Sequence, residues 1–205
     1  MPASAKSGRY HHGDLRAALV DAAVVLIGER GVRGFSLAEA SRRLGVSAAA
    51  PYRHFADRDD LLAAVAIRGL QVFAAMVTAE AGDAEAPEPR LAAVARAYVR
   101  FAAEQRPLFD TLFNAGIDKS RYPELQRAWE PVDEFFTVVT EICGGDQAAA
   151  DALAAALEAT AHGYATLLLD GDAEPDSAAV AAAAYGAAAA TRALIAGRKA
   201  LGSGM

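Results

Sequence analysis

Apolar residues recur every three or four positions along most of the chain, the spacing that places them on one face of an α-helix. The first clear example lies between Asp14 and Gly31, where the glycine marks the end of the helix. Its apolar positions are Leu15, Leu19, Ala22, Ala23 and Leu26. No segment shows the alternation typical of a β-strand, and no internal repeat is evident. The pattern predicts an all-α protein.

Capping signals predict two short helices after this first one. The segment "SLAE", which starts at Ser36, has the form of a capping box. The helix that it opens ends at Gly45, since glycine can adopt the positive φ angle that closes a helix. Ser47 is a natural N-cap for a third helix from Ala48 to about Phe55. Pro51 then lies in its first turn, where the missing amide costs little.

Asp57 caps a longer fourth helix, which is expected to end near Ala81 before the acidic linker "GDAEAPEP". Five more helices are predicted, and Pro131 is expected to kink or break one of them. Their approximate ranges are 90–105, 107–115, 123–143, 147–169 and 176–201. The chain is therefore expected to have about nine helices in two parts. Residues 1–58 form a helix-turn-helix domain with an N-terminal arm, and residues 59–205 form a larger helical domain.

Composition agrees with a well-buried helical protein, because 54% of residues are hydrophobic and many of these are alanine. A single cysteine, Cys143, cannot form an internal disulfide, which fits a reducing cytoplasm. No signal peptide is expected. The range Ala178–Gly197 is long enough for a membrane span, but alanine contributes little to insertion and Arg192 opposes it. A buried helix is the better interpretation, so no membrane partner is predicted.

Charge is distributed unevenly. Residues 1–58 hold nine Lys/Arg and five Asp/Glu, a net +4, and the remainder has a net charge of −10. A basic head on an acidic body is typical of a small nucleic-acid module attached to another domain. The negative body also favours a neutral or cationic ligand.

Residue identity makes the prediction more specific. The run "FSLAEASRRLGVSAAAPYRHFADRDDLLAAV", preceded by "ALVDAAVVLIGERG", resembles the TetR family of transcriptional regulators. The family's elements occur in order: Ser36, the small Ala40, "GVS", the aromatic Tyr52, "HF" and the basic Arg58. The resemblance covers about a quarter of the chain. It implies a DNA-binding head, a body with a ligand pocket, and a homodimer on a near-palindromic operator.

Several residues of the head are candidates for contact with double-stranded DNA. Ser36, Ser47 and Arg58 are placed for phosphates. The alternatives are that Ser47 is simply a helix cap and that Arg58 is a solvated charge. Tyr52 and His54 can bind backbone oxygens, whereas Phe55 is expected in the core. The candidates that could read or touch bases are Arg53 and the methyl groups of Ala48, Ala49 and Ala50.

Alanine departs from the polar or basic residues frequent in the family at positions 48 and 49, so direct base readout is expected to be modest. DNA shape would then contribute more. Arg9, in the N-terminal arm, could enter a minor groove, or the arm could be disordered.

Two groups of residues stand out in the body. Small residues followed by a leucine are expected on one helix face, either at a dimer interface or in an internal contact: Ala182, Gly186, Ala190 and Leu194. An aromatic group with one histidine is expected either to line a ligand pocket or to form ordinary core. Its members are Tyr98, Phe101, Phe109, Phe113, Trp129, Phe135, Phe136 and His162.

The sequence favours neither an enzyme nor a metalloprotein. Cys143 has no histidine nearby in the chain, and His11 and His12 lack metal-ligand spacing. No cofactor is predicted. The expected function is a ligand-responsive, dimeric transcriptional repressor with an unknown small-molecule effector. The alternative is a helical dimer that binds a small molecule or a protein and whose head no longer binds DNA specifically.

Overall fold

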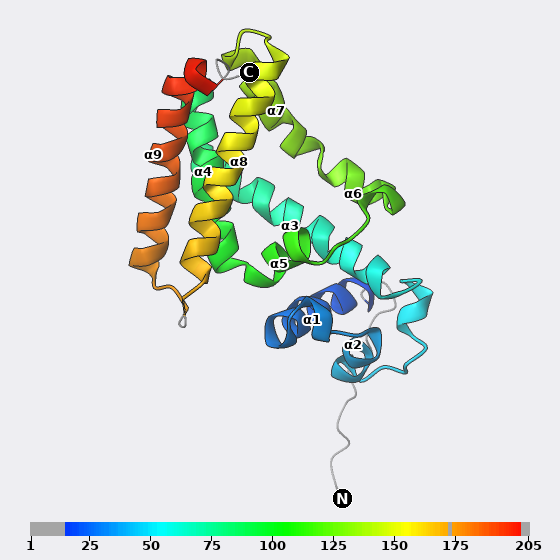
Figure 1. Cartoon of the computed structure of the whole chain (residues 1–205). Helices are drawn as coiled ribbons and strands as arrows, with labels where there is room; N and C mark the ends of the chain where they lie inside the picture. Colours follow the sequence, from blue (N-terminus) through cyan, green and yellow to red (C-terminus); the bar gives the residue numbers. More distant parts are fainter. Residues whose placement is uncertain (1–14, 172–173, 202–205) are drawn as a thin grey trace, which may run out of the picture.

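The structure of the chain is a computed structural model that describes residues 15–171 and 174–201, except for the side chains of residues 132–134, 136 and 201. Over these ranges the chain forms nine α-helices and three short 3-10 helices, with no strand (Figure 1). The all-α prediction is therefore confirmed. Arg9 lies outside the described residues, as does the side chain of Phe136.

The head begins with three helical segments whose ends follow the predicted capping signals. They are α1 (Leu15–Arg30), η1 (Val32–Gly34) and α2 (Leu37–Leu44). The Ser36 hydroxyl accepts a hydrogen bond from the amide of Glu39 at 3.3 Å, and Gly45 closes α2 with a φ of 68°. The long helix α3 (Arg58–Ala81) starts in the same way, because the Asp57 carboxylate accepts from the amide of Asp60 at 2.9 Å.

The third helix of the head is shorter than predicted. Instead of a helix from Ala48 to Phe55, the chain forms a turn and then the 3-10 helix η2 (Pro51–Arg53). The predicted Ser47 side-chain cap is absent, and the Ser47 carbonyl instead accepts from the amide of Ala50 at 3.0 Å. A helix capped at Ser47 would need the amide of residue 51 for its first regular hydrogen bond. Proline has no such amide, and its ring crowds the preceding turn.

The body contains six α-helices and one 3-10 helix. Their bounds are α4 (Pro87–Glu104), α5 (Arg106–Asn114), η3 (Lys119–Arg121), α6 (Pro123–Ala128), α7 (Glu130–Ile142), α8 (Gln147–Leu169) and α9 (Ser177–Leu201). The predicted helix 123–143 is broken at Trp129, and Pro131 lies in the first turn of α7. Helices α4, α8 and α9 lie side by side at the end of the molecule away from α1 and α2 (Figure 1).

Helix α3 joins the two parts of the molecule (Figure 1). Its first half carries Leu61, Leu62 and Val65, which are buried in one cluster with head residues such as the predicted core residue Phe55. The same cluster continues into the body through Phe101 and other residues of α4 and α5. The core of the head is therefore continuous with that of the body through α3.

Three of the described helices are long and apolar enough to cross a membrane by length and composition alone. They are Arg58–Ala81, Gln147–Leu169 and Ser177–Ala200. In the fold, α3, α8 and α9 all pack against α4. Much of the apolar content of α8 and α9 is alanine, which contributes little to membrane insertion.

Candidate nucleic-acid interface and ligand cavity

The segment between α2 and α3 is displayed on the surface of the head. Ser47, Ala48, Ala49 and Arg53 are exposed, and Tyr52 is 60% exposed. Two residues of the same segment, Pro51 and Phe55, are buried and hold it on the core. A large exposed aromatic ring beside an exposed guanidinium provides both stacking area and hydrogen-bond donors. This surface can contact a polyanion such as DNA.

Arg53 differs from most arginines of the head, because its guanidinium makes no hydrogen bond or ion pair with the described residues. Arg30 and Arg42 both pair with Glu39, and Arg43 pairs with Glu29 at 2.8 Å. Those pairs neutralise part of the positive charge counted in the sequence. The charge of Arg53 remains available to an external partner.

Arg58 has a different arrangement from the one expected. Its guanidinium donates to the backbone carbonyls of Val32 and Phe35, the latter at 3.2 Å, and lies 5.5 Å from the Phe35 ring centroid. A further contact joins it to Asp59 at 3.4 Å. These groups occupy the guanidinium, so a phosphate would have to replace one of them; the phosphate contact of Arg58 stays a prediction. In the structure, Arg58 ties the start of α3 to the loop that carries η1.

The body contains a cavity of about 470 Å³ between α3, α4 and α8, with α6 and α7 along one side. Five of the eight predicted pocket residues line it: Tyr98, Phe101, Phe113, Trp129 and Phe135. Phe109 and His162 lie behind this wall, where their rings stack with centroids 6.0 Å apart. The aromatic group therefore serves in part as cavity wall and in part as core.

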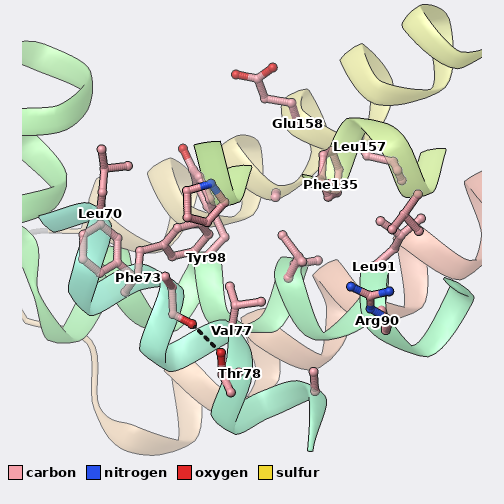
Figure 2. A pocket seen from close by; sticks show the side chains of 18 of the residues that line it. Leu70, Phe73, Val77, Thr78, Arg90, Leu91, Tyr98, Phe135, Leu157 and Glu158 are labelled. Atoms are coloured by element: carbon pink, nitrogen blue, oxygen red, sulfur yellow. Dashed lines mark hydrogen bonds between the residues drawn. The ribbon is translucent and has the colours of Figure 1, made fainter. Parts of the chain in front are cut away.

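One wall of the cavity, contributed by α3, was not among the predicted pocket residues. It consists of Leu70, Phe73, Ala74, Val77, Thr78 and Ala81. These positions continue the three- and four-residue spacing of the helix, a signal that sequence alone attributes to ordinary core. Figure 2 shows Leu70 and Phe73 at one end of the cavity and Arg90 and Leu91 at the other, with Tyr98 between them.

Tyr98 is held in place by a hydrogen bond between its hydroxyl and Nδ1 of His162, at 2.9 Å. Burial raises the pKa of Tyr98 well above its ordinary value, and the nearby Glu158 carboxylate adds to the effect. The phenol therefore stays neutral at physiological pH, and its hydrogen bond holds the Tyr98 ring in the cavity wall. It does not act as a base.

The polar groups that line the cavity are few. Arg90 and Glu158 are exposed residues at its edge, and neither forms an ion pair with the described residues. The indole Nε1 of Trp129 is buried and has no hydrogen-bond partner within the described part of the chain. A mostly apolar wall with a few polar groups is typical of a small-molecule site.

The four predicted interface residues do not share one environment. Gly186 faces α8, because a Cβ there would lie 2.7 Å from Cε1 of Tyr164, and Leu194 packs against the core of the same chain. Ala182 is exposed and Ala190 is half-buried. The larger exposed apolar side chains are Leu167 on α8, which is 76% exposed, and Tyr185 on α9, which is 72% exposed. Neither was predicted, since their exposure depends on how the two helices pack.

No group of three or more His, Cys, Asp or Glu side chains within residues 15–171 and 174–201 is placed to hold a metal ion.

Comparisons with known proteins bear on both parts of the chain. Residues 19–65 match the family model for bacterial regulatory proteins of the tetR family. Residues 91–196, more than half of the chain, match a model described as a tetracycline repressor-like C-terminal domain. A curated relative, the HTH-type transcriptional regulator BetI of Brucella anthropi, is 33% identical over 90 residues. That match covers 44% of this chain and 45% of the relative, so it spans less than half of the relative's length.

Solved structures match over almost the whole chain. A protein of unknown function from Rhodococcus sp. RHA1 is 34% identical, with 90% of this chain and 98% of that one covered and a TM-score of 0.69. AibR in complex with isovaleryl coenzyme A and operator DNA is 16% identical, with 86% and 97% covered and a TM-score of 0.62. At this lower identity the likeness shows the fold.

Proposed function

The chain belongs to the TetR family of transcriptional regulators, and we propose that it is a ligand-responsive repressor that binds a near-palindromic operator as a homodimer. Regulators of this family are DNA-binding proteins, and a cytoplasmic location follows from that role. The observation that carries the proposal is the exposed segment 47–54, which presents an unpaired arginine and a tyrosine on a packed head. The related AibR was solved with operator DNA, which supports the same use of this fold.

In the proposed complex, the exposed segment enters the major groove. Arg53 donates to a guanine edge or to a phosphate, while Tyr52 and His54 contact the backbone. The methyl groups of Ala48 and Ala49 lie close enough to the groove floor to touch a thymine methyl. Because alanine offers no hydrogen bond, these positions discriminate weakly among bases. Sequence preference then comes from Arg53 and from DNA shape.

The homodimer is proposed to form through α8 and α9. Exposed apolar side chains on these two helices, chiefly Leu167 and Tyr185, provide area that water solvates poorly. A two-fold axis between them would bring two copies of each helix into a four-helix bundle. The two heads would then face half-sites about one helical turn, roughly 34–36 Å, apart.

Ligand control is proposed to act through α3. This helix lines the cavity with Leu70, Phe73 and Val77, and packs into the head core through Leu62 and Val65. A ligand that prefers one position of α3 would change the separation of the two heads. It would release DNA only to the extent that it binds the state with the changed head separation more tightly than the operator-bound state.

The test begins with isolation of the operator, by sequencing genomic fragments that the purified full-length protein retains. Operator affinity is then measured for the wild type, for Arg53→Ala, and for Arg127→Ala as a control. Arg127 is an exposed arginine on α6 that pairs with no described residue. Arg53→Ala is expected to bind roughly tenfold to a hundredfold more weakly. If Arg53 holds a phosphate, the salt slope falls by about one as well.

An Arg53→Ala variant that binds as tightly as the wild type across a salt series would contradict the proposed contact. A pull-down that enriches no genomic fragment would favour the alternative, a ligand-binding helical dimer whose head no longer recognises DNA.

A further inference from the structure

A lysine lies against the aromatic wall of the cavity. The Nζ atom of Lys119, on η3, is 3.6 Å from the ring centroid of Trp129, which lines the cavity. Among aromatic side chains, the indole face of tryptophan attracts a cation most strongly. The pair shows that the Trp129 ring, which borders the cavity, accepts a positive charge.

A carboxylate faces the same region. Glu158 lines the cavity, and its negative charge acts on both Lys119 and Tyr98. Its carboxylate makes no hydrogen bond or ion pair with the described residues. Burial lowers the pKa of Lys119, while the Glu158 charge opposes that change and favours the ammonium form. The region around Trp129 and Glu158 is thus suited to a cation that has lost part of its water.

From this geometry we infer that the cavity binds an amphiphilic organic cation. Its positive charge takes the place of the Lys119 ammonium beside Trp129 and Glu158, and its apolar part lies along α3 and α4. This inference rests on the proposed function, since it names the class of effector for the same cavity.

The shape of the cavity agrees with an elongated ligand. The lining positions from Leu70 to Ala81 span three helical turns of α3, which is about 16 Å at 1.5 Å per residue. Trp129 packs with the cluster that contains Leu70, whereas Arg90 lies at the opposite end (Figure 2). The Arg90 guanidinium repels a cation, so the charged group belongs at the Trp129 end.

Lys119 can leave this position without disturbing the core. It is an exposed residue on a three-residue 3-10 helix between α5 and α6, and its side chain has four rotatable bonds. When the ammonium swings into water it regains hydration, which offsets part of the lost contact. The Trp129 indole Nε1, which has no partner among the described residues, is also available to an acceptor on the ligand.

The experiment uses the single tryptophan of the chain as its own reporter. Trp129 fluorescence of the full-length protein is titrated with three ten-carbon probes: decyltrimethylammonium, decanol and decanoate. The concentrations stay below the micelle concentrations of the two ionic probes and below the solubility limit of decanol. The ammonium probe is expected to bind about tenfold more tightly than decanol, and decanoate more weakly than decanol.

Three variants separate the contributions of the charges. Glu158→Gln is expected to weaken binding of the ammonium probe about tenfold and to leave decanol unchanged. Lys119→Met, which removes the competing charge, is expected to strengthen ammonium binding severalfold with no effect on decanol. Glu174→Gln is the charge-matched control, because this exposed residue before α9 does not line the cavity.

Decanoate binding as tight as that of the ammonium probe would overturn the inference, and so would an unchanged ammonium affinity in Glu158→Gln. An unchanged affinity of Lys119→Met for the ammonium probe would contradict the proposal that the ligand's charge takes the place of the Lys119 ammonium. Operator binding is measured separately, without probe. A wrong ligand class therefore leaves operator binding intact, and failure of operator binding leaves the titrations interpretable.

Discussion

At the scale of single residues, Arg58 shows how a basic side chain next to the proposed DNA-binding segment can serve the fold. Its guanidinium donates hydrogen bonds to two backbone carbonyls and lies over the ring of Phe35. The sequence offers Arg58 as a phosphate ligand and Arg53 as a ligand of a guanine or a phosphate. The structure separates them, because Arg53 is exposed and unpaired whereas the donors of Arg58 are directed inward.

Arg58→Ala is therefore expected to destabilise the protein by about 1.5–3 kcal/mol, the range for hydrogen bonds to a charged group. Chemical unfolding followed by circular dichroism measures the change. Arg53→Ala is the matched control and should shift stability by no more than about 0.5 kcal/mol. The opposite result, a stable Arg58→Ala variant that has lost operator affinity, would favour the phosphate role.

At the scale of helices, the contact between α3 and α4 depends on a small cluster of charges. The Glu80 carboxylate accepts from Arg96 at 2.9 Å and from Arg100 at 2.6 Å, and Arg96 also donates to the Glu80 carbonyl. Partial burial pushes the pKa of Glu80 upward, but the hydrogen bonds from the two arginines outweigh it and hold the pKa below 4.5, its ordinary value. The C-terminal end of α3 is thereby tied to α4.

Glu80→Gln is expected to lower the free energy of unfolding by about 1 kcal/mol at pH 7, because the arginine partners are partly exposed. The pKa of Glu80 is lower in the folded than in the unfolded chain. Its contribution is therefore present above the ordinary pKa and lost as pH falls through the folded value. The difference between wild type and variant should shrink below about pH 4.5, the ordinary value.

Unfolding curves between pH 3 and pH 7 test this expectation, with Glu174→Gln as the control. A difference that stays constant over that range would show that Glu80 contributes through packing and not through its charge.

At the scale of the whole molecule, the dimer proposal depends on apolar side chains that the monomer leaves in water. Leu167 lies on α8 and Tyr185 lies on α9. Both side chains are exposed, although these helices pack against α4 and against each other. Gly186 permits the close contact of α9 with Tyr164 of α8, so this glycine serves a contact within the subunit.

The double variant Leu167→Glu, Tyr185→Glu is expected to be monomeric at micromolar concentration, because it would place charges in an apolar interface. Analytical ultracentrifugation measures the mass. Val25→Glu is the control, since Val25 is also apolar and 44% exposed but lies on α1. A double variant that keeps the mass of a dimer would place the interface elsewhere.

The sequence by itself determined the helical class and most helix ends, because these depend on local chemistry. Helical spacing, the caps at Ser36 and Asp57 and the positive φ of Gly45 act within a few residues. Even the shortened third helix has a local cause, in that Pro51 removes the amide that a regular helix needs at that point.

Only the tertiary structure decided what individual side chains do, because that depends on partners distant in sequence. It directed Arg58 inward, placed the α3 stripe on a cavity wall, and set Lys119 against Trp129. Helical spacing reports that a face is buried, but it cannot distinguish a face that meets another helix from one that borders a cavity. That distinction depends on how α3, α4 and α8 pack together.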